Sequence, residues 1–521
     1  MQAEGEVVLN ANRDMTSGAL AKTLKGSYGV ELQPHTANRL KRRVVGVSEE
    51  SQDEGYQRLQ SFLELLASGS PGTITDSEWD DEGHFIRCFV MPGAVASFAC
   101  AGVQQVACMD FAHMKGDWNG TIGTISTKSS NNNVVHFATC IVPKESGDSY
   151  RYLVENALKN PTVAAFLNKP STSIITDKHK GSESALPQIL TLAELLRCGE
   201  HFLKNNGAVG PEGRMHFYQA ARAPDKATCD FHLEKIKALN LAAGTRIAEA
   251  PREKWAMYAT RGNTVWDDVT FNAAEATNSA MGADTRAKPV FDLIQDVVMQ
   301  SAAKVAAAAT LKANDPAAIH TPFAMKTFNA EMEWSKTCGV SPTGSGGYMV
   351  YPNNSRRHYN VVALVFHPAD PTRHEFTCTC GFCHRWLIPC RHVIAVARGA
   401  PTSILRCNDE HQKLLELVDD GYRLDKLRAA ASDPRFRLVP PVWSSLTVNP
   451  EHKAPLRVDG QAGRKKGVRK TKRKTSNGEH AISSRAYANH VAASNSQTDA
   501  MPSVSQGLSQ LSQGAGSGAV A

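Results

Sequence analysis

The sequence lacks any run of about 18 consecutive apolar residues, the length needed to span a bilayer as a helix. It also lacks an N-terminal basic segment followed by an apolar one, so we expect neither a secretory signal nor a membrane partner. Twelve cysteines in 521 residues are too few for a disulfide-dense scaffold. No internal repeat is apparent. At 42% apolar residues, the chain is instead expected to form about two to four globular domains.

Acidic residues are missing from the segment 464–474, which concentrates positive charge near the C-terminus. The formal net charge is +7, so without this segment's eight basic residues the chain carries −1. Such a tail predicts neutralisation of DNA phosphates, nuclear import, or simply a solvated segment. Residues 476–521 are rich in Ser, Gln, Ala and Gly and predict disorder. The eight basic residues are Arg464, Lys465, Lys466, Arg469, Lys470, Lys472, Arg473 and Lys474.

Hydrophobic periodicity predicts an α/β region followed by a helical one. Residues 1–83 are expected to be a helical region with a basic patch at 39–43 that could face DNA. The expected strands are 85–91, 103–111, 121–126, 134–142 and 173–176, with later strands at 348–350 and 359–366. The expected helices are 54–68, 149–159, 183–197, 213–223, 226–240, 249–260, 270–282 and 288–313.

Four of the cysteines fall within one short segment that also contains two histidines. A CxC pair, Cys378 and Cys380, is followed after nine intervening residues by Cys390 and His392 in a CxH pair. Zinc prefers four such thiolate and imidazole ligands in a tetrahedron, and the apolar helix expected at 393–397 would favour thiolate charge at its start. The alternative is a set of free core cysteines with an unrelated histidine.

Two aspartates occur where short, apolar strands are expected to end. Asp110 lies at the end of the strand expected at 103–111, and Asp177 follows 173–176. Carboxylates at the ends of neighbouring strands would lie close together and attract Mg²⁺ or Mn²⁺, which can stabilise the attacking and leaving oxygens of a phosphodiester. A lone aspartate at such a position is more often a cap or a turn residue.

The blocks around these residues resemble the Mutator-like element (MULE) transposases over about residues 35–400. The resemblance rests on a block that begins at Asp110 and on a second block that contains Asp177. It rests further on Cys198 and His201 as a CxxH pair, and on Glu275 within a T-x-N-x-x-E-x-x-N block. The cysteine–histidine segment is similar to a SWIM zinc finger, the usual companion domain in that family. By this resemblance the zinc ligands are Cys378, Cys380, Cys390 and His392, while spacing leaves Cys383 and His384 as further candidates.

The resemblance implies an RNase H-like catalytic domain at 84–335 with a helical insertion at about 205–270. A SWIM finger at 340–400, a helical extension at 401–450 and a tail at 451–521 would follow. Asp110, Asp177 and Glu275 would form the DDE triad that holds Mg²⁺ or Mn²⁺. Cys198 and His201 are expected to support the active site rather than bind zinc, because two ligands cannot complete a zinc site.

The sequence therefore predicts a DDE transposase that binds terminal inverted repeats and assembles as a homo-oligomer on double-stranded DNA. The protein is expected in the nucleus, which it would enter through the nuclear import machinery. One alternative is a transposase-derived transcription regulator that binds DNA without cleaving it. Another is a SWIM-based adaptor for protein interactions. Metal-dependent cleavage separates the first interpretation from the second, and DNA binding of any kind separates both from the third.

Overall fold

The computed structural model describes most of the chain up to Leu456. The described residues are 8, 15, 17–32, 36–37, 40, 49–114, 118, 120–207, 210–260, 285–312, 318–344, 346–352, 360–367, 370–399 and 414–456. They divide into two compact units. Unit 1 contains residues 1–222, 233–323 and 421–457, and unit 2 contains residues 223–232, 324–420 and 458–521. Within the described part, no helix is long and apolar enough to cross a bilayer.

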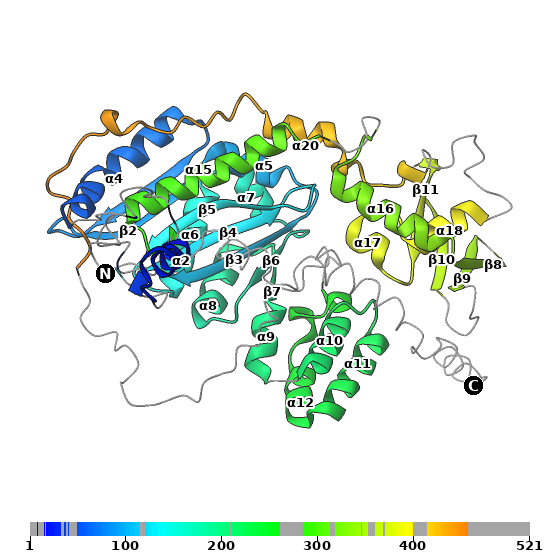
Figure 1. Ribbon diagram of the computed structural model, residues 1–521. Coiled ribbons are helices and arrows are strands. Elements are labelled where there is room, and N and C mark those ends of the chain that lie inside the picture. Colours follow the sequence, from blue (N-terminus) through cyan, green and yellow to red (C-terminus); the bar gives the residue numbers. More distant parts are fainter. Residues whose placement is uncertain are drawn as a thin grey trace, which may run out of the picture. The chain divides into compact units, whose positions relative to one another are not determined.

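Unit 1 is built on a seven-stranded mixed sheet in the order β1-β2-β5-β4-β3-β6-β7 (Figure 1). From β1 to β3 each neighbouring pair is antiparallel, whereas β3, β6 and β7 run parallel to one another. The mixed α/β class predicted from the sequence is confirmed. The strands are β1 (Ile74–Trp79), β2 (Phe85–Met91), β3 (Val106–His113), β4 (Thr121–Lys128), β5 (Val134–Val142), β6 (Ser173–Thr176) and β7 (Glu194–Arg197).

Both faces of this sheet are buried under helices, as alternate residues of one strand show. On β2, Phe89 and Met91 join a core with α5 (Gly93–Cys100), α6 (Gly147–Leu158), α7 (Pro161–Leu167) and α8 (Lys180–Ile189). Cys88 and Val90 point to the other face and join a core with α4 (Glu49–Gly69) and the first half of α15 (Val290–Ala309). Figure 1 shows α15 running along the sheet between α4 and α20 (Leu424–Ala431).

Two expected elements of this region are wrong. The helix expected at 183–197 ends at Ile189, and residues 194–197 form β7, because pairing with β6 outweighs the helical preference of a Glu-Leu-Leu-Arg segment. The strand containing Asp110 does not end there but continues to His113, paired with β4. The sequence also gave no sign of β1, whose polar residues 75–78 are all half-buried at an edge of the sheet.

Beyond β7 the chain forms α9 (Gly199–Asn206), α10 (Gly210–Ala221), α11 (Lys226–Leu239) and α12 (Leu241–Glu249). The helix expected at 249–260 is wrong: two 3₁₀ turns, Arg252–Lys254 and Met257–Ala259, follow Pro251 instead. Stacked rings of Phe202, Phe217 and Trp255, with centroids 5.6–5.8 Å apart, join α9 to α10 and to the first turn. The 270–282 helix lies outside the described residues.

The C-terminal part of unit 1 packs along α4 and the β1–β2 hairpin. Between 420 and 456 the helical segments are α20 and the 3₁₀ turns Asp420–Tyr422 and Trp443–Ser445, so this part of the extension expected at 401–450 is largely irregular chain, while residues 401–413 lie outside the described residues. The backbone N–H of Asn449 donates to the Gln57 carbonyl (2.9 Å). The His452 ring stacks on Trp79 at 3.7 Å between centroids. Residues 421–456 are therefore part of this unit rather than a separate domain.

Unit 2 contains a four-stranded antiparallel sheet in the order β11-β10-β9-β8, together with helices. The two strands expected at 348–350 and 359–366 are confirmed as β9, which is longer, and β10, which is shifted by one residue, while β8 and β11 were not predicted. The described elements are α16 (Pro322–Ser335), β8 (Cys338–Gly344), β9 (Gly347–Pro352), β10 (Asn360–His367), β11 (Asp370–Cys378), α17 (Phe382–Trp386) and α18 (Arg391–Gly399).

The N-terminal region contains one helix that the sequence pattern did not indicate, α2 (Ser17–Tyr28). Its Leu20 and Leu24 are fully buried and pack with Val8 in a small core of their own. The helix expected at 54–68 is confirmed as α4. Of the basic patch at 39–43, only Leu40 belongs to the described residues, so its expected role in facing DNA lies outside them.

Candidate metal centre and acidic site

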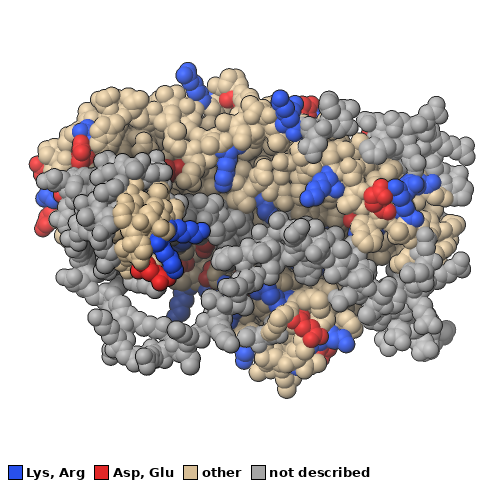
Figure 2. All heavy atoms as spheres, viewed as in Figure 1, with Lys and Arg blue, Asp and Glu red and all other residues tan. Residues whose placement is uncertain are grey.

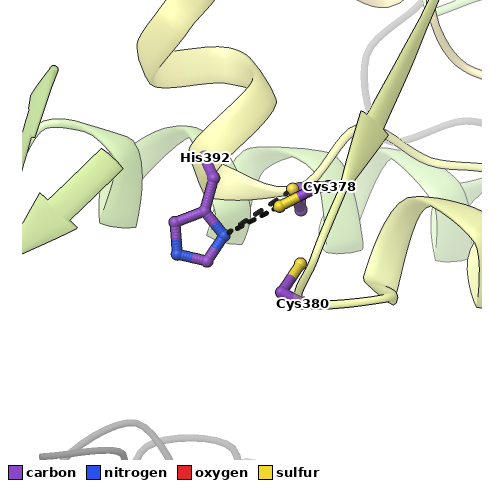
Figure 3. A group of neighbouring side chains, drawn as sticks. Cys378, Cys380 and His392 are labelled. Carbon is purple, nitrogen blue, oxygen red and sulfur yellow. Dashed lines mark hydrogen bonds between the residues drawn. The ribbon is translucent and has the colours of Figure 1, made fainter. Parts of the chain in front are cut away.

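The four predicted zinc ligands meet in unit 2. The ligand atoms of Cys378, Cys380, Cys390 and His392 all lie within 4.8 Å of one another. Figure 3 shows Cys378 at the end of β11, Cys380 just beyond it and His392 at the start of α18, all pointing inward. This cluster, called here the Cys3His cluster, is the group of donors that can hold a metal ion such as zinc.

Local chain geometry explains how a short segment gathers these donors. Gly381 has φ +70°, a left-handed conformation that turns the chain from Cys380 into α17. Leu387, at φ +51°, ends α17 and directs the chain back toward Cys390. The backbone N–H of Cys390 donates to Cys383 Sγ at 3.2 Å, which fixes the start of α18.

The two distances from His392 to cysteine sulfurs are close to those of a tetrahedral zinc site. His392 Nδ1 lies 3.5 Å from Cys378 Sγ and 3.8 Å from Cys390 Sγ. A tetrahedron with Zn–S of about 2.3 Å and Zn–N of about 2.0 Å separates sulfur and nitrogen ligands by roughly 3.5 Å. Contacts with the Cys380 and Cys390 sulfurs and burial raise the pKa of Cys378. Crowded thiols of this kind need a cation before all of them can ionise.

His392 is also adapted to thiolate neighbours. Burial lowers the pKa of His392, but hydrogen bonds to the Cys380 and Cys390 sulfurs outweigh burial and raise the pKa to about 10. The two further candidates do not belong to this set of four. Cys383 lies beside Cys390, whose side chain it contacts and whose N–H it accepts, and the His384 side chain is exposed.

A buried ion pair that sequence reasoning missed anchors the start of α18. Glu331 on α16 accepts hydrogen bonds from the backbone N of Arg391 (2.7 Å), from Arg391 Nε (3.1 Å) and from its terminal nitrogen (2.8 Å). The Glu331 side chain is only 4% exposed. Nothing in the sequence signals this contact, because the partners lie 60 positions apart. The predicted boundary at 335 assigns α16 to the catalytic domain, whereas α16 packs within unit 2.

The predicted acids lie side by side on the sheet of unit 1. The parallel registers pair Met109 with Thr176 and Thr176 with Arg197. The next position along the three strands therefore contains Asp110, Asp177 and Cys198 in one row. The backbone N–H of Cys198 donates to the Thr176 carbonyl at 2.9 Å, which extends the ladder to this row.

The predicted CxxH pair brings a histidine to this row. Cys198 is fully buried and directly precedes α9, whereas His201 lies in its first turn. His201 Nε2 lies 3.9 Å from Asp177 Oδ2, an ion-pair distance when the imidazole is protonated. Asp177 Oδ1 is buried and accepts no hydrogen bond from the described residues.

Beside His201, Glu200 fixes α9 to α10. Arg214 donates to Glu200 at 2.9 Å, and the Tyr218 hydroxyl donates to its other oxygen at 2.7 Å. Burial raises the pKa of Glu200, but these hydrogen bonds outweigh it and lower the pKa to about 2. The first turn of α9, which contains His201, is therefore held by a charged contact.

A second group of side chains near the two aspartates was not predicted. The Tyr150 hydroxyl donates to Glu145 Oε1 at 2.9 Å, and His179 Nδ1 lies 3.5 Å from the same oxygen. The pKa of Tyr150 is raised by burial first, then by Glu145, and also by the charges of Asp110 and Asp177. The charges of both aspartates therefore raise the pKa of the same hydroxyl group. No pattern in the sequence indicated this contact of Glu145.

The loops that carry Glu145 and His179 are in close contact. A Cβ built on Gly181 would lie 2.7 Å from the backbone N of Gly147, so only glycine fits there. His179 caps α8 by accepting the Gly181 N–H at 3.1 Å. The segment after Asp177 is thus fixed in place rather than left as a free loop.

Several predicted residues lie outside the described residues. They include the third acid, Glu275, the T-x-N-x-x-E-x-x-N block, the basic run from Arg464 to Lys474 and the segment 476–521. Among the described residues, no group of three or more carboxylates, histidines or cysteines other than the Cys3His cluster is close enough to hold a metal. On the face seen in Figure 2, Lys and Arg side chains of the described residues are scattered and do not form one continuous patch.

Comparison with protein-family models found no match to this chain, and comparison with curated proteins found none either.

Proposed function

We propose that this chain is a DDE transposase of the Mutator-like group that cleaves and joins DNA with divalent metal ions. The observation that carries the proposal is the row formed by Asp110, Asp177 and Cys198 on parallel β3, β6 and β7, with His201 3.9 Å from Asp177. Neighbouring carboxylates can hold divalent metal ions, which stabilise the attacking and leaving oxygens of a phosphodiester.

The sheet order supports an RNase H-like interpretation of the fold. An antiparallel meander, β3-β4-β5, is extended on the β3 side by two parallel strands, β6 and β7. This order agrees with the strands, helix and further strand that the resemblance implies. It also puts the first two acids on neighbouring strands although 67 residues separate them in the sequence.

The two aspartates fit the metal that the proposal requires. Asp177 Oδ1 is buried without a hydrogen-bond donor among the described residues, and oxygen ligands of this kind suit Mg²⁺ or Mn²⁺. Asp110 and Asp177 would hold the metal, with Glu275 as the proposed third ligand. When bound, the metal would activate a water or hydroxyl nucleophile and stabilise charge on the scissile phosphate.

The remaining residues of the site have roles of their own in this proposal. His201 orients the Asp177 carboxylate through its Nε2 and, when protonated, lowers the cost of gathering negative charge at the row. Tyr150 holds Glu145 at the edge of the site, and the buried Tyr150 hydroxyl remains a neutral donor because its pKa is raised. Cys198 fills the buried end of the row and is not a metal ligand.

The Cys3His cluster is proposed to bind a structural zinc ion that holds β11, α17 and α18 together. The eight basic residues from Arg464 to Lys474 are proposed to contact DNA phosphates and to direct the protein to the nucleus. The DNA partner would be the terminal inverted repeats, bound by a homo-oligomer.

Strand cleavage by the full chain tests the proposal. The substrate is a duplex of the genomic DNA that flanks the gene, with Mg²⁺ or Mn²⁺. Asp110→Asn and Asp177→Asn should reduce cleavage more than ~100-fold while duplex binding stays within a few-fold, because each change removes a metal ligand but keeps its shape. Glu183→Gln, which alters an exposed ion pair with Arg197 on the same unit, is the control and should cleave normally.

Three results would contradict the proposal in different ways. Equal loss of binding and cleavage in the aspartate variants would make these residues part of the fold only. Binding without cleavage by the unaltered chain would favour the transcription regulator. An unaltered chain that binds no DNA would favour the protein-interaction adaptor.

A further inference from the structure

Both nitrogens of the His392 ring have a neighbour in unit 2. On one side, Nδ1 faces the sulfurs of Cys378 and Cys390 at 3.5 and 3.8 Å (Figure 3). On the other side, Nε2 lies 3.2 Å from the side-chain nitrogen of Asn360, the first residue of β10. The ring is therefore held between the Cys3His cluster and an amide that does not belong to it.

The Asn360 amide is itself fixed by the hairpin that carries two of the thiols. The Thr379 hydroxyl donates to Asn360 Oδ1 at 3.2 Å and accepts the backbone N–H of Val361 at 3.0 Å. Thr379 lies between Cys378 and Cys380, and its backbone N–H donates to the Val361 carbonyl at 3.0 Å. Any shift of the CxC turn is thus transmitted to the amide, and from the amide to the histidine ring.

The position of the proton on the His392 ring decides whether the Asn360 amide must donate a hydrogen bond to Nε2 or accept one from it. A metal at Nδ1 takes the lone pair of that nitrogen, so the ring proton is on Nε2 and needs an acceptor. The amide nitrogen of Asn360 faces Nε2, an orientation that suits a ring with a lone pair on Nε2 rather than the metal-bound tautomer.

A half-turn of the same amide suits the metal-bound tautomer. The Asn360 oxygen would then face Nε2–H, and its nitrogen would face the Thr379 hydroxyl, which can accept that donor as well as the Val361 N–H. Oxygen and nitrogen of an amide have the same shape, so the exchange requires no movement of the backbone. Aspartate offers the acceptor in both orientations, and leucine offers neither group.

We propose that Asn360, held by Thr379, is a positioning residue of the metal centre that accepts the His392 Nε2–H when zinc is bound. This inference rests on the proposed zinc site. Partners of this kind fix the tautomer and orientation of a histidine ligand and raise its basicity, and their loss typically weakens metal binding about 10–100-fold.

The test is zinc affinity of the full chain, measured by competition with a chelator of known affinity. Asn360→Leu should bind zinc about tenfold more weakly, whereas Asn360→Asp should stay within about threefold of the unaltered chain. Thr379→Val should weaken zinc binding about threefold, because it frees the amide. Thr377→Val is the matched control, since Thr377 is an exposed threonine two residues earlier whose hydroxyl donates to the Ala363 carbonyl, and it should bind zinc normally.

A spectroscopic readout separates positioning from general stability. In the zinc-loaded chain labelled with ¹⁵N histidine, the Nε2–H of His392 should be protected from solvent exchange in the unaltered protein and in Asn360→Asp, and exposed in Asn360→Leu. Equal zinc affinity and equal exchange for Asn360→Leu and the unaltered chain would overturn the role of Asn360 while leaving the zinc site intact. An unaltered chain that binds no zinc would overturn the zinc site and this role with it.

Discussion

The Cys3His cluster and the acidic row draw their side chains from the sequence in opposite ways. All four donors of the cluster come from one segment, Cys378 to His392, and the turns at Gly381 and Leu387 bring them together. Asp110 and Asp177 come from strands 67 residues apart and meet only through the parallel pairing of β3 with β6. Local spacing in the sequence therefore brings the donors of the Cys3His cluster together, whereas long-range sheet topology brings the two aspartates of the acidic row together.

The largest expected effect is the loss of the cluster's metal on removal of one donor. Cys390→Ser should abolish zinc binding by the full chain and melt unit 2, because structural zinc contributes about 10–16 kcal/mol of binding free energy through its four ligands. Zinc per chain, by atomic emission, is the measurement. Cys383→Ser is the matched control and should keep its zinc, because a serine oxygen can still accept the Cys390 N–H. Equal loss in both variants would place Cys383 among the ligands.

A smaller effect is expected from the buried ion pair that supports the cluster. Glu331→Gln leaves the Arg391 guanidinium, 16% exposed, without its carboxylate and should destabilise unit 2 by about 3 kcal/mol in chemical unfolding. Glu333→Gln, on the same helix, alters an exposed pair with Lys336 and should cost less than about 0.5 kcal/mol. Similar values for the two variants would show that the site depends on its short segment alone.

What the sequence could predict follows the same division. The strands 85–91, 134–142 and 173–176 were predicted with their observed bounds, because each is rich in β-branched and other apolar residues. The Cys3His donors were predicted because their spacing is local. In contrast, β7 was read as helix, since only its pairing with β6 makes Glu194–Arg197 a strand.

Contacts between distant residues were beyond the reach of sequence patterns for the same reason. Glu331 touches Arg391, Glu145 meets Tyr150 and His179, and Asn360 meets His392, yet none of these residues belongs to a motif that marks the contact. The path of residues 432–456 along α4 has no periodicity and depends on single hydrogen bonds such as Asn449 to Gln57.

The acidic row should respond to its histidine by a modest change in rate. His201→Ala should lower metal-dependent cleavage about tenfold, or about 1.4 kcal/mol, with little change in the thermal midpoint and no loss of zinc. Exposed His384, in unit 2, is the control, and His384→Ala should cleave normally. A His201→Ala chain that melts early or loses a second metal equivalent would contradict the supporting role.

An effect that is negligible at neutral pH and grows in acid concerns the sheet that carries the acids. Burial lowers the pKa of His136 to about 3, so the folded state keeps the imidazole neutral. Below pH 6.5 the unfolded chain binds a proton at His136 that the folded chain does not bind. The free energy of unfolding therefore decreases as the pH is lowered from 6.5 to 3, by up to about 1.4 kcal/mol per pH unit. His136→Gln should remove this part of the slope in urea unfolding at several pH values. An unchanged slope would assign the acid sensitivity to other groups.

Binding of Mn²⁺ to the zinc-loaded full chain, followed by electron paramagnetic resonance, tests the central claim most directly because it needs no DNA. The account predicts that the unaltered chain binds Mn²⁺ and that Asp110→Asn and Asp177→Asn each weaken this binding at least about tenfold, while zinc stays at one per chain. Mn²⁺ binding that is absent from the unaltered chain, or unchanged in both variants, would contradict the claim that the acidic row is a second metal site.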